Sequence, residues 1–455
     1  MTESKHYDLI VIGGGSGMRV MSAAANDWGW KVALVEEGPL GGTCLNRGCI
    51  PSKILIHTAD LIEDIKNAGK FGVDARVDSV DFKKVMARAN TFVDCEAEDI
   101  EKGVTESANI DFYKMRGEFT GDKTIRVGNE TISADRILIS AGTRPTVPPI
   151  EGLADVAYIT STEALRLQEL PKSMIIIGGG YIAAELGHFY GTLGTKVTIV
   201  ETADMLVARE DKEIARAFTE IFSGKHTVLL GYKVTKVAEE AGLKNVTVQG
   251  ADGAQKTLEA ETLLLTVGRR PNTDILALEN TGVKVSEKGY IEVNEFMETS
   301  VPGVWALGDI VGKAPFKHGA NYEARHVIEN MREGGAKKAV DYAIMPHAIF
   351  SSPQIAGVGL TEEEAREKGV RYEVRRREYK KTGFGKAIEE DRGFVKYLID
   401  PDGDTILGCH IMGPHAAILI HEVVVAMSAA GGKASAIRDA IHINPALSEL
   451  VQWAL

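Results

Sequence analysis

Two segments of the 455-residue chain repeat one pattern: an apolar strand, a run of glycines, a helix, and a second strand that ends on a glutamate. The first copy begins at Tyr7–Ile12 and ends at Glu36, and the second begins at Met174–Ile177 and ends at Glu201. A continuous apolar run before a glycine turn is typical of a strand buried in a parallel sheet. The repeat therefore predicts two α/β domains, each built as a parallel sheet with helices on its faces.

The first glycine run has the residues of a dinucleotide-binding turn. We expect Gly13 to make the tight turn after the strand and Gly15 to let the backbone approach a pyrophosphate. Glu36 would then accept a hydrogen bond from a ribose hydroxyl. Met18 stands where helix–strand packing normally requires glycine or alanine, so either the helix stands away from the strand or its first turn is rearranged. The dinucleotide contacts expected from this copy are Gly13, Gly15, Ser16, Gly17 and Glu36.

The second glycine run satisfies the same fingerprint fully, because Ala183 fills the third small position. Glu201 ends the second strand, where a carboxylate accepts from a ribose 2′-hydroxyl and repels a 2′-phosphate. NADH is therefore favoured over NADPH, and Arg209 is the nearby basic residue that could oppose this preference. Two nucleotides in one chain are an arrangement for passing a hydride between them. The contacts expected from this copy are Gly178, Gly180, Tyr181, Ile182 and Glu201.

Two of the four cysteines, Cys44 and Cys49, lie five residues apart. A disulfide needs Cα atoms within about 4.4–6.8 Å, whereas five residues of regular helix rise by about 7.5 Å. The pair can therefore close only on distorted backbone, which Gly41, Gly42 and Pro51 would supply. A structural disulfide is the plain alternative. In a reducing cytosol, however, a strained and partly exposed bridge is of the labile, catalytic kind.

This stretch resembles the redox-active motif of the flavin-dependent pyridine nucleotide-disulfide oxidoreductases, and the resemblance covers nearly the entire chain. It implies FAD as a cofactor and a redox-active disulfide between Cys44 and Cys49. Cys44 would exchange with an external disulfide, and Cys49, expected to be the more buried cysteine, would face the flavin. The resemblance also implies that Lys53 lies beside the flavin N5 and pairs with Glu185, although a simple helix-surface pair is the alternative.

Further cofactor contacts follow from the same resemblance. Two apolar strands end in small-residue turns at Gly142 and Gly268, where the chain would leave its nucleotide domains. Residues 299–309 resemble the second FAD motif of the family, whose aspartate, here Asp309, holds the ribityl chain. His318 would lie near the flavin, and a plain surface histidine is an equal alternative. The contacts added in this way are Gly42, Thr43, Gly142, Gly268, Asp309, His318 and Ala320.

The resemblance implies an α/β fold with two Rossmann-like dinucleotide-binding domains and a C-terminal α+β dimerisation domain. A cluster of prolines after Thr143 cannot continue a central strand and marks a boundary. The FAD domain would be discontinuous, because its second motif follows the NAD fingerprint in the chain. The predicted parts are residues 1–147 and 272–343 for FAD, 148–271 for NAD, and 344–455 for the interface of a homodimer.

The clearest departure from the family lies near the C-terminus, where residues 442–449 align with the motif His-x-His-Pro-Thr-x-x-Glu. Asn444 occupies the place of the catalytic histidine, which the glutamate matching Glu449 orients in the family. An amide cannot take up a proton at neutral pH. His442 could substitute only from about 6.6 Å away in extended backbone. Three explanations stay open: thiol exchange is slow, the acceptor needs no base, or the residue was altered on purpose.

Composition limits the partners. A net charge of −12 argues against nucleic acid. The first residues lack a signal peptide, and the apolar stretch 416–430 is too short and too polar to span a bilayer, so we expect a cytoplasmic protein without a membrane partner. No cysteine or histidine stands at metal-ligand spacing from Cys95, and we expect no metal site. The basic run 375–381 could attract an acidic carrier, but such runs are more often solvated.

We therefore expect an enzyme similar to dihydrolipoamide dehydrogenase, because of Glu201 and the wording Cys-Leu-Asn-x-Gly-Cys. Electrons would pass between NAD(H), FAD and the cysteine pair, with a small thiol or disulfide, or a lipoyl carrier domain, as partner. One alternative is a low-molecular-weight disulfide reductase similar to mycothione or glutathione reductase. Another is a flavoprotein without the base, kept for docking to a lipoyl-bearing complex or for a non-disulfide acceptor.

Overall fold

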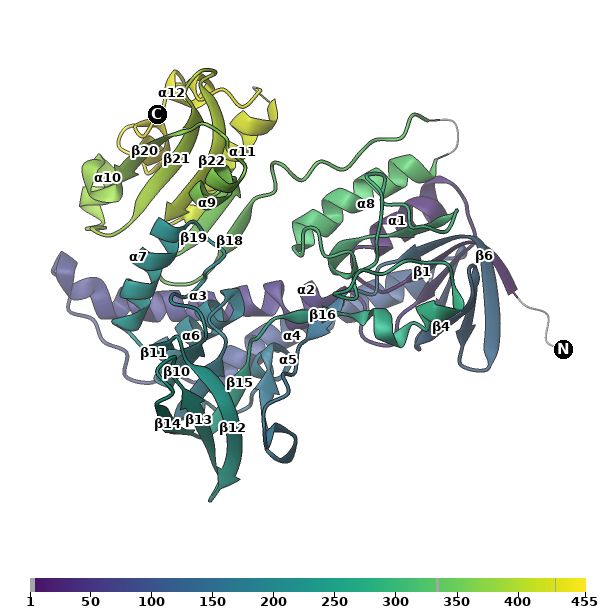
Figure 1. Ribbon diagram of the computed structural model, residues 1–455, viewed down its shortest axis with the longest axis horizontal. Coiled ribbons are helices and arrows are strands. Elements are labelled where there is room, and N and C mark those ends of the chain that lie inside the picture. Colours follow the sequence, from purple (N-terminus) through teal and green to yellow (C-terminus); the bar gives the residue numbers. More distant parts are fainter. Residues whose placement is uncertain (1–4, 333–334, 430) are drawn as a thin grey trace. The chain divides into compact units, whose positions relative to one another are not determined.

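The computed structural model describes residues 5–332, 335–429 and 431–455 (Figure 1). Its residues form two compact units, each assembled from segments that are distant in sequence. Unit 1 contains the described residues of 1–52, 86–146 and 269–342, and unit 2 contains those of 53–85, 147–268 and 343–455. The assignment of these segments to FAD, NAD and interface domains, with the boundaries given above, remains a proposal.

Unit 1 is built on one sheet whose parallel strands come in the order β3-β2-β1-β6. The long β6 pairs in parallel with β1 and β17, and its first residues pair antiparallel with β5, which continues to β4. The strands are β1 (Lys5–Ile12), β2 (Val32–Val35), β3 (Ile110–Tyr113), β4 (Gly117–Gly121), β5 (Thr124–Val127), β6 (Glu130–Ile139) and β17 (Val304–Ala306). A short ribbon of β7 (Thr143–Pro145) and β16 (Arg269–Pro271) completes the unit.

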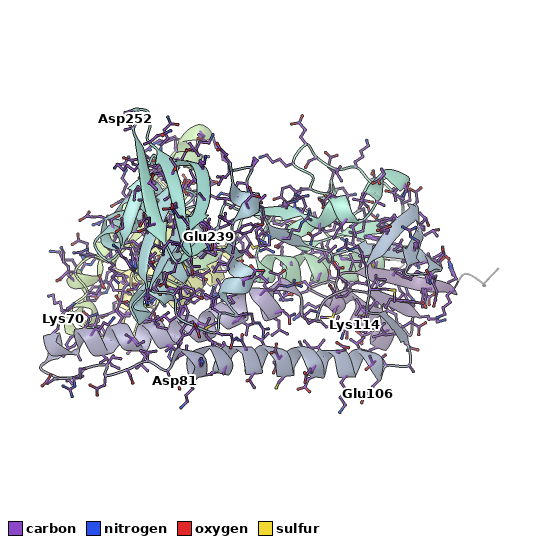
Figure 2. All side chains as sticks on the ribbon, turned by 90° about the horizontal axis from the view of Figure 1, so that it is seen from below. Lys70, Asp81, Glu106, Lys114, Glu239 and Asp252 are labelled. Carbon is purple, nitrogen blue, oxygen red and sulfur yellow. The ribbon has the colours of Figure 1, made fainter. Side chains whose placement is uncertain are left out.

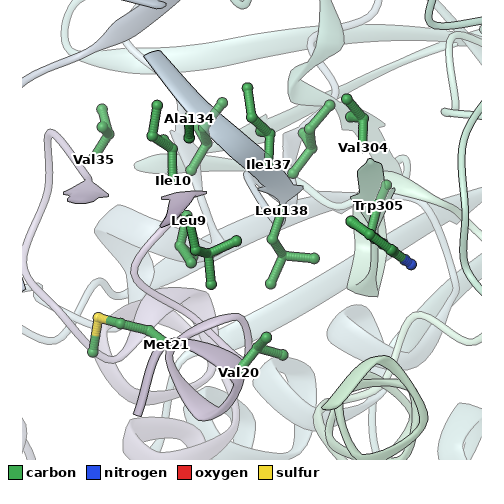
Figure 3. Close-up of a cluster of buried hydrophobic side chains, with 14 of the residues drawn as sticks. Leu9, Ile10, Val20, Met21, Val35, Ala134, Ile137, Leu138, Val304 and Trp305 are labelled. Carbon is green, nitrogen blue, oxygen red and sulfur yellow. The ribbon is translucent and has the colours of Figure 1, made fainter. Parts of the chain in front are cut away.

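Side chains of both sheet faces form the core of unit 1, because residues 9–12, 32–35 and 137–139 of the central strands are apolar and buried. Leu9 and Leu138 point toward Val20 and Met21 of helix α1 (Met18–Ser22), whereas their neighbours Ile10 and Ile137 point to the opposite face (Figure 3). This alternation is expected where a parallel sheet is covered on both faces.

Helix α1 shows how the chain accommodates Met18 where glycine or alanine is usual. Its first turn is α-helical, and a π-helix follows at Ala23–Asp27. Met18 is half-buried against the core. The irregularity in this helix therefore lies one turn later than we expected.

Helices α2 (Gly42–Arg47) and α8 (Lys317–Met331) belong to unit 1, whereas α3 (Cys49–Asn67) continues from unit 1 into unit 2 and α4 (Phe82–Thr105) continues from unit 2 into unit 1. Asp81 and Glu106 mark the two ends of α4 in Figure 2, and the Asp81 carboxylate accepts a hydrogen bond from the Lys84 N–H at 3.0 Å. Cys95 is a free, exposed thiol on α4.

Unit 2 contains a second parallel sheet, in the order β11-β10-β9-β15-β8. Its strands are β8 (Ile159–Thr160), β9 (Ser173–Ile177), β10 (Lys196–Glu201), β11 (Thr227–Leu230) and β15 (Thr262–Leu265). Helix α6 (Tyr181–Leu193) connects β9 to β10, and α7 (Lys212–Ser223) precedes β11. A meander of β12 (Lys233–Glu240), β13 (Leu243–Gln249) and β14 (Gln255–Ala260) follows, with Asp252 at its tip (Figure 2). The second repeat is thus an open parallel sheet, as its pattern predicts.

The C-terminal part of unit 2 is an antiparallel sheet, in the order β18-β19-β22-β21-β20, with helix α11 (Ala416–Ala429) packed in its core. The strands are β18 (His347–Ile349), β19 (Ile355–Gly359), β20 (Glu373–Glu378), β21 (Phe394–Asp400) and β22 (Thr405–Met412). Short helices α9 (Glu362–Glu367), α10 (Gly383–Ala387), α12 (Ser435–Arg438) and α13 (Ser448–Gln452) surround it. Cys409 is buried in β22.

Some apolar side chains of this part are exposed, and some of its basic side chains are paired although the sequence suggests that they are solvated. The apolar side chains of Ile418, Val425, Ile441 and Ile443 are exposed. By contrast, part of the basic run 375–381 is paired within the chain: Arg376 pairs with Glu213, Arg375 with Glu373 and Lys380 with Glu378. These pairs reduce the positive charge that the run offers to an acidic carrier. Ala430, the last residue of the predicted apolar stretch, lies outside the described residues, and within those residues no helix combines the length and apolarity that a bilayer crossing needs.

Candidate active site

The first glycine turn is shaped by contacts with the end of β6. Gly13 has φ +106°, and a Cβ there would lie 2.4 Å from the Ser140 carbonyl oxygen. A Cβ on Gly17 would lie 2.1 Å from the Ser140 Oγ. Both positions therefore require glycine. A Cβ on Gly15 would meet only the Gly42 Cα at 3.8 Å, so the backbone at Gly15 stays open.

The second glycine turn has the same construction. Gly178 has φ +101°, and its Cβ would lie 2.7 Å from the Thr266 carbonyl oxygen. The Thr266 hydroxyl donates to the carbonyls of Ile177 and Gly178, as the Ser140 hydroxyl does to those of Ile12 and Gly13. A Cβ on Gly180 would meet nothing within 4 Å.

Both turns fit a dinucleotide. An open glycine backbone between a strand end and a helix start is the geometry that accepts a pyrophosphate. The residues that would hold FAD are those at Gly13–Gly17, and the residues that would hold the pyridine nucleotide are those at Gly178–Ile182, where Tyr181 and the half-buried Ile182 begin α6.

The two glutamates at the strand ends have a structural task that sequence reasoning missed. The Glu36 carboxylate accepts from the N–H groups of Gly14 at 2.8 Å and Gly38 at 2.7 Å. The Glu201 carboxylate accepts in the same way from the N–H groups of Gly179 and Ala203. Both oxygens of Glu36 keep a second lone pair, and so does Oε2 of Glu201, whereas Oε1 of Glu201 also accepts from the Thr202 hydroxyl at 2.9 Å. A ribose hydroxyl can therefore still donate to either carboxylate. Each glutamate therefore holds its glycine turn in place and can also contact the nucleotide.

Cys44 and Cys49 lie on two successive helices. Gly41 and Gly42 turn the chain into α2 with φ values of +101° and +67°, as predicted. Helix α2 ends at Gly48, whose φ of −154° and ψ of −114° are not helical, and Cys49 begins α3. A Cβ on Gly48 would lie 2.9 Å from the Thr43 carbonyl oxygen. The backbone distortion that two cysteines five residues apart require is therefore centred on Gly48, which sequence reasoning missed; Pro51 lies inside α3.

One expectation about the cysteines is wrong. Cys49 was expected to be the more buried, but its side chain is exposed and Cys44 is half-buried. As the first residue of α3, Cys49 has no preceding helical turn over its side chain. Burial therefore gives no basis for dividing roles between the two cysteines.

Lys53 and Glu185 form the predicted pair, in unit 2. The Lys53 Nζ lies 2.7 Å from both carboxylate oxygens of Glu185, and the Glu185 side chain is only 12% exposed. Glu185 also accepts from the Phe350 N–H at 3.0 Å, and the Lys53 ammonium lies 4.8 Å from the centre of the Phe350 ring. This is a fixed, partly buried pair rather than one on an open helix surface. The contribution of Phe350 could not be predicted.

Asp309 belongs to a polar network of unit 1. The Thr143 hydroxyl donates to the Asp309 carboxylate at 2.9 Å, and the Arg269 Nε donates to the Thr143 Oγ at 2.8 Å. Beside it, the buried Glu323 accepts from the Gly308 N–H at 2.6 Å and from the Tyr342 hydroxyl at 2.7 Å. Burial raises the pKa of Glu323 to about 7. Sequence reasoning missed Thr143, Arg269 and Glu323, although Arg269 directly follows the predicted Gly268.

The other predicted cofactor contacts lie on the same elements. Gly142 and Gly268 have φ values of +65° and +102°, with open space at their Cβ positions. His318 is exposed in the first turn of α8, where its ring stacks on Phe316, and Ala320 is buried. Gly42 and Thr43 begin α2, and the Ser16 hydroxyl donates to the Asn321 side chain on α8 at 3.1 Å.

Positive groups surround the cysteines. Burial lowers the pKa of Lys317, and the negative charges that Cys44, Cys49 and Asp309 can carry oppose this shift. Burial also lowers the pKa of Arg269, while Asp309 and Cys49 act in the opposite direction. Such surroundings favour the thiolate form of a cysteine. Sequence reasoning missed Lys317, whose only signal is its place beside His318.

The C-terminal segment of unit 2 holds Asn444 and Glu449 together. The Asn444 amide donates to the Glu449 carboxylate, which is buried and also accepts from the Ala446 N–H at 3.3 Å. Two residues earlier, the His442 Nε2 lies 2.5 Å from a Glu422 oxygen, and its Nδ1 lies 3.1 Å from the Ala440 carbonyl oxygen. Both ring nitrogens of His442 therefore face oxygens of this chain, two residues before Asn444.

Comparison with known proteins covers the whole chain. The family model described as pyridine nucleotide-disulphide oxidoreductase matches residues 7–334, and the model of the corresponding dimerisation domain matches residues 345–455. Mitochondrial dihydrolipoyl dehydrogenase of Dictyostelium discoideum is 37% identical, over 99% of this chain and 94% of that protein. Mycothione reductase of Mycobacterium tuberculosis is 36% identical, over 99% and 98%. The Cu(II) complex of the HOCl-induced flavoprotein disulfide reductase RclA from Escherichia coli superimposes with a TM-score of 0.87 at 30% identity, covering 99% of both chains.

Proposed function

Since the chain belongs to the pyridine nucleotide-disulphide oxidoreductase family and is an FAD-dependent enzyme of that family, we propose that it catalyses dithiol–disulfide exchange through Cys44 and Cys49, with NAD(H) as its nucleotide. The observation that carries the proposal is the helix break at Gly48, which puts the two cysteines on separate helices. Without a break, their separation along one helix exceeds what a disulfide allows.

The exchange proceeds as follows when a disulfide is reduced. The Cys44 thiolate attacks one sulfur of the substrate, which forms a mixed disulfide and releases the other sulfur as a thiolate that takes up a proton. The Cys49 thiolate then attacks Cys44, forms the Cys44–Cys49 disulfide and releases the second thiol. Lys317 and Arg269 favour the thiolates by their charge. FAD supplies the transfer of two electrons between the pyridine nucleotide and the cysteine pair.

For the substrate, we infer an activity similar to that of dihydrolipoyl dehydrogenase, with a dihydrolipoyl group on a small molecule or a carrier domain. Glu201 and the wording of residues 44–49 support it. Mycothione reductase is a relative at nearly the same identity, so reduction of a low-molecular-weight disulfide is the alternative. The matched dimerisation domain supports a homodimer. In it, Asn444 of one subunit would face the thiols of the other, as the resemblance implies.

A second candidate function is the reduction of a metal ion. The observation that favours it is Asn444, whose amide cannot take up a proton, at the place of the family's catalytic histidine. A dithiol and two Cu(II) ions give a disulfide, two Cu(I) ions and two protons that solvent accepts, so no protein base is needed. RclA, which has the same fold, is known as a Cu(II) complex.

The deciding experiment is a steady-state assay of the purified protein with three substrate sets. These are dihydrolipoamide with NAD, a panel of small disulfides with NADH, and Cu(II) with NADH. Turnover in the first set supports the proposed function. Turnover only in the second or third moves the assignment to the corresponding alternative. A protein that turns over none of them would support the docking interpretation.

Exchanging either active-site cysteine for serine should abolish thiol turnover. In Cys44→Ser the attacking thiolate is gone, and in Cys49→Ser the mixed disulfide cannot be resolved. Both variants should still reduce an artificial acceptor such as ferricyanide from NADH, because that reaction needs no thiol. Cys95→Ser is the matched control, since Cys95 is an exposed thiol on α4, and it should leave every rate unchanged. Full disulfide turnover by Cys44→Ser would show that the exchange does not run through this pair.

Glu201 should make NADH the preferred nucleotide. Repulsion between one carboxylate and a 2′-phosphate at about 4 Å amounts to about 1–4 kcal/mol, depending on the local dielectric. We expect kcat/KM for NADH to exceed that for NADPH at least severalfold, and Glu201→Gln to narrow the ratio. Glu240→Gln makes the same change at the exposed end of β12 and should leave the ratio in place. An equal or higher kcat/KM for NADPH in the unmodified protein would show that Arg209 overrides the carboxylate.

A further inference from the structure

The turn that follows β10 is tied to the second glycine turn. The Val207 N–H donates to the Gly179 carbonyl at 2.8 Å, and the Glu210 N–H donates to the Val207 carbonyl at 2.9 Å. Val207 has φ +46°, in the left-handed region that a β-branched residue rarely adopts. Such a conformation persists only where surrounding contacts hold it, and it is often found beside a functional site. Glu210, three residues later, is buried.

Glu210 connects this turn to the C-terminal sheet of unit 2. Its side chain is only 1% exposed, and one carboxylate oxygen lies 2.8 Å from the His347 Nε2 on β18. Burial by itself lowers the pKa of His347, but the hydrogen bond and charge of Glu210, together with the charge of Glu364, raise it above its ordinary value. The pair is therefore an ion pair when His347 is protonated.

The same two residues contact Tyr181, the first residue of α6. The Tyr181 and His347 rings are parallel within 4°, with centres 6.4 Å apart. Burial, the charge of Glu210 and a hydrogen bond with Glu210 raise the pKa of Tyr181, so its phenol stays neutral. Gly357 leaves room for His347, because a Cβ there would lie 2.7 Å from the His347 ring and 3.0 Å from that of His410 on β22.

We propose that Glu210 and His347 are positioning residues for the pyridine nucleotide, because they hold Tyr181 at the start of the helix that follows the open glycine turn. The inference rests on the proposed function in one respect, that this turn binds NAD(H). Tyr181 directly follows Gly180, and a pyrophosphate binds where such a helix begins. Nucleotide affinity should therefore depend on a histidine of the C-terminal sheet.

The dependence on pH has a defined sign. Because the pKa of His347 is raised, the ion pair is complete below about pH 6.5 and is lost as the pH rises through the raised value. The charged groups that act on His347 are Glu210 and Glu364, and His410 faces it across Gly357 from β22, two strands away in the sheet. NAD should consequently bind more weakly at pH 8.5 than at pH 6.

The test is equilibrium binding of NAD to the oxidised holoenzyme by calorimetry at both pH values. The variants are His347→Gln, which keeps a donor for Glu210 without a charge, His347→Phe, which keeps the ring alone, and Glu210→Gln. We expect His347→Phe and Glu210→Gln to weaken binding at pH 6 by about tenfold, the scale of one hydrogen bond to a charged group. His347→Gln should bind with no pH dependence. His57→Gln, an exposed histidine on α3, is the matched control and should behave as the unmodified protein.

Two results are decisive and distinct. If the unmodified protein does not bind NAD, the nucleotide assignment fails and this inference falls with it. If NAD binds, but the three variants keep the affinity and pH profile of the unmodified protein, Glu210 and His347 are structural only and the inference is wrong. A higher KM for NADH with unchanged kcat toward ferricyanide would support it independently.

Discussion

Replacing Asn444 with histidine should raise turnover with dithiol or disulfide substrates by about 10²–10⁴-fold, the usual worth of general acid–base catalysis. The site is prepared for this change. The buried Glu449 carboxylate already accepts a hydrogen bond from the Asn444 amide. An imidazole Nδ1–H can donate to the same oxygen, which leaves Nε2 to exchange a proton with a substrate thiol.

The effect should be confined to the thiol step. Reduction of ferricyanide by NADH involves no thiol proton, so it should be equal in Asn444→His and in the unmodified protein. Asn444→Ala is the matched control, because it removes the amide without adding a base, and it should gain nothing. Glu449→Gln in the Asn444→His background should lose most of the gain, since the histidine would no longer be oriented. If Asn444→His improves no accepted substrate, position 444 is not where the base of this enzyme belongs.

The repeat could be predicted from the sequence because its signals are local. The strand before Gly13 and the strand before Gly178 are continuous apolar runs, and glycine turns follow them directly. Such patterns depend on neighbouring residues alone. The positions of Glu36 and Glu201 at strand ends follow from the same pattern. The closeness of Cys44 and Cys49 in the chain is likewise a local signal.

The polar contacts of the site could not be predicted in the same way, because their partners are far apart in sequence. Glu210 and His347 are separated by 137 residues, and the Thr143–Asp309 hydrogen bond joins residues 166 apart. Lys53 and Glu185 were anticipated only through the family resemblance. The helix break at Gly48 was missed although it is a local feature, because a glycine inside a helical pattern does not by itself show that the helix ends there. The glycine turns can be predicted from the sequence, whereas the side chains that hold them in place come together only in the folded chain.

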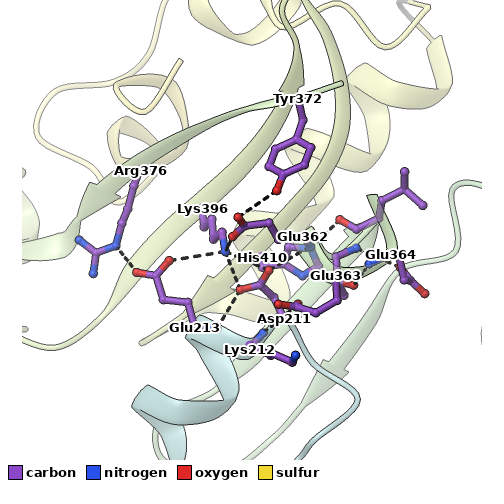
Figure 4. A network of polar contacts seen from close by, with 12 residues as sticks. Asp211, Lys212, Glu213, Glu362, Glu363, Glu364, Tyr372, Arg376, Lys396 and His410 are labelled. Carbon is purple, nitrogen blue, oxygen red and sulfur yellow. Dashed lines mark hydrogen bonds and ion pairs between the residues drawn. The ribbon is translucent and has the colours of Figure 1, made fainter. Parts of the chain in front are cut away.

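The second large effect, a loss of stability, is expected at a buried ion cluster in unit 2. Lys396 on β21 is only 3% exposed, and its Nζ lies 2.9 Å from the Asp211 carboxylate and 2.6 Å from that of Glu362 (Figure 4). Asp211 also accepts from the N–H groups of Glu213 and Glu362, at the start of α7 and of α9. The lysine thus pairs with two carboxylates, of which Asp211 is also fixed by backbone hydrogen bonds.

Lys396→Met should destabilise the protein by about 3–5 kcal/mol at neutral pH, because it removes one partner of a buried pair and leaves the charged partners behind. The measurement is the urea concentration at the midpoint of unfolding, monitored by a spectroscopic signal that arises in unit 2. Lys236→Met, which breaks an exposed pair with Glu151, is the matched control and should leave the midpoint unchanged.

The pH dependence of this variant separates a lost charge from lost packing. Burial raises the pKa of Asp211 and of Glu362, but hydrogen bonds and the charge of Lys396 outweigh it and lower both pKa values overall. In the unmodified protein, the stability that these carboxylates provide is present above about pH 4 and is lost as the pH falls through the lowered values. Without Lys396 burial dominates, so protonation favours the fold and the deficit should shrink toward pH 4. A deficit that is constant from pH 4 to pH 8 would mean that Lys396 matters only for packing.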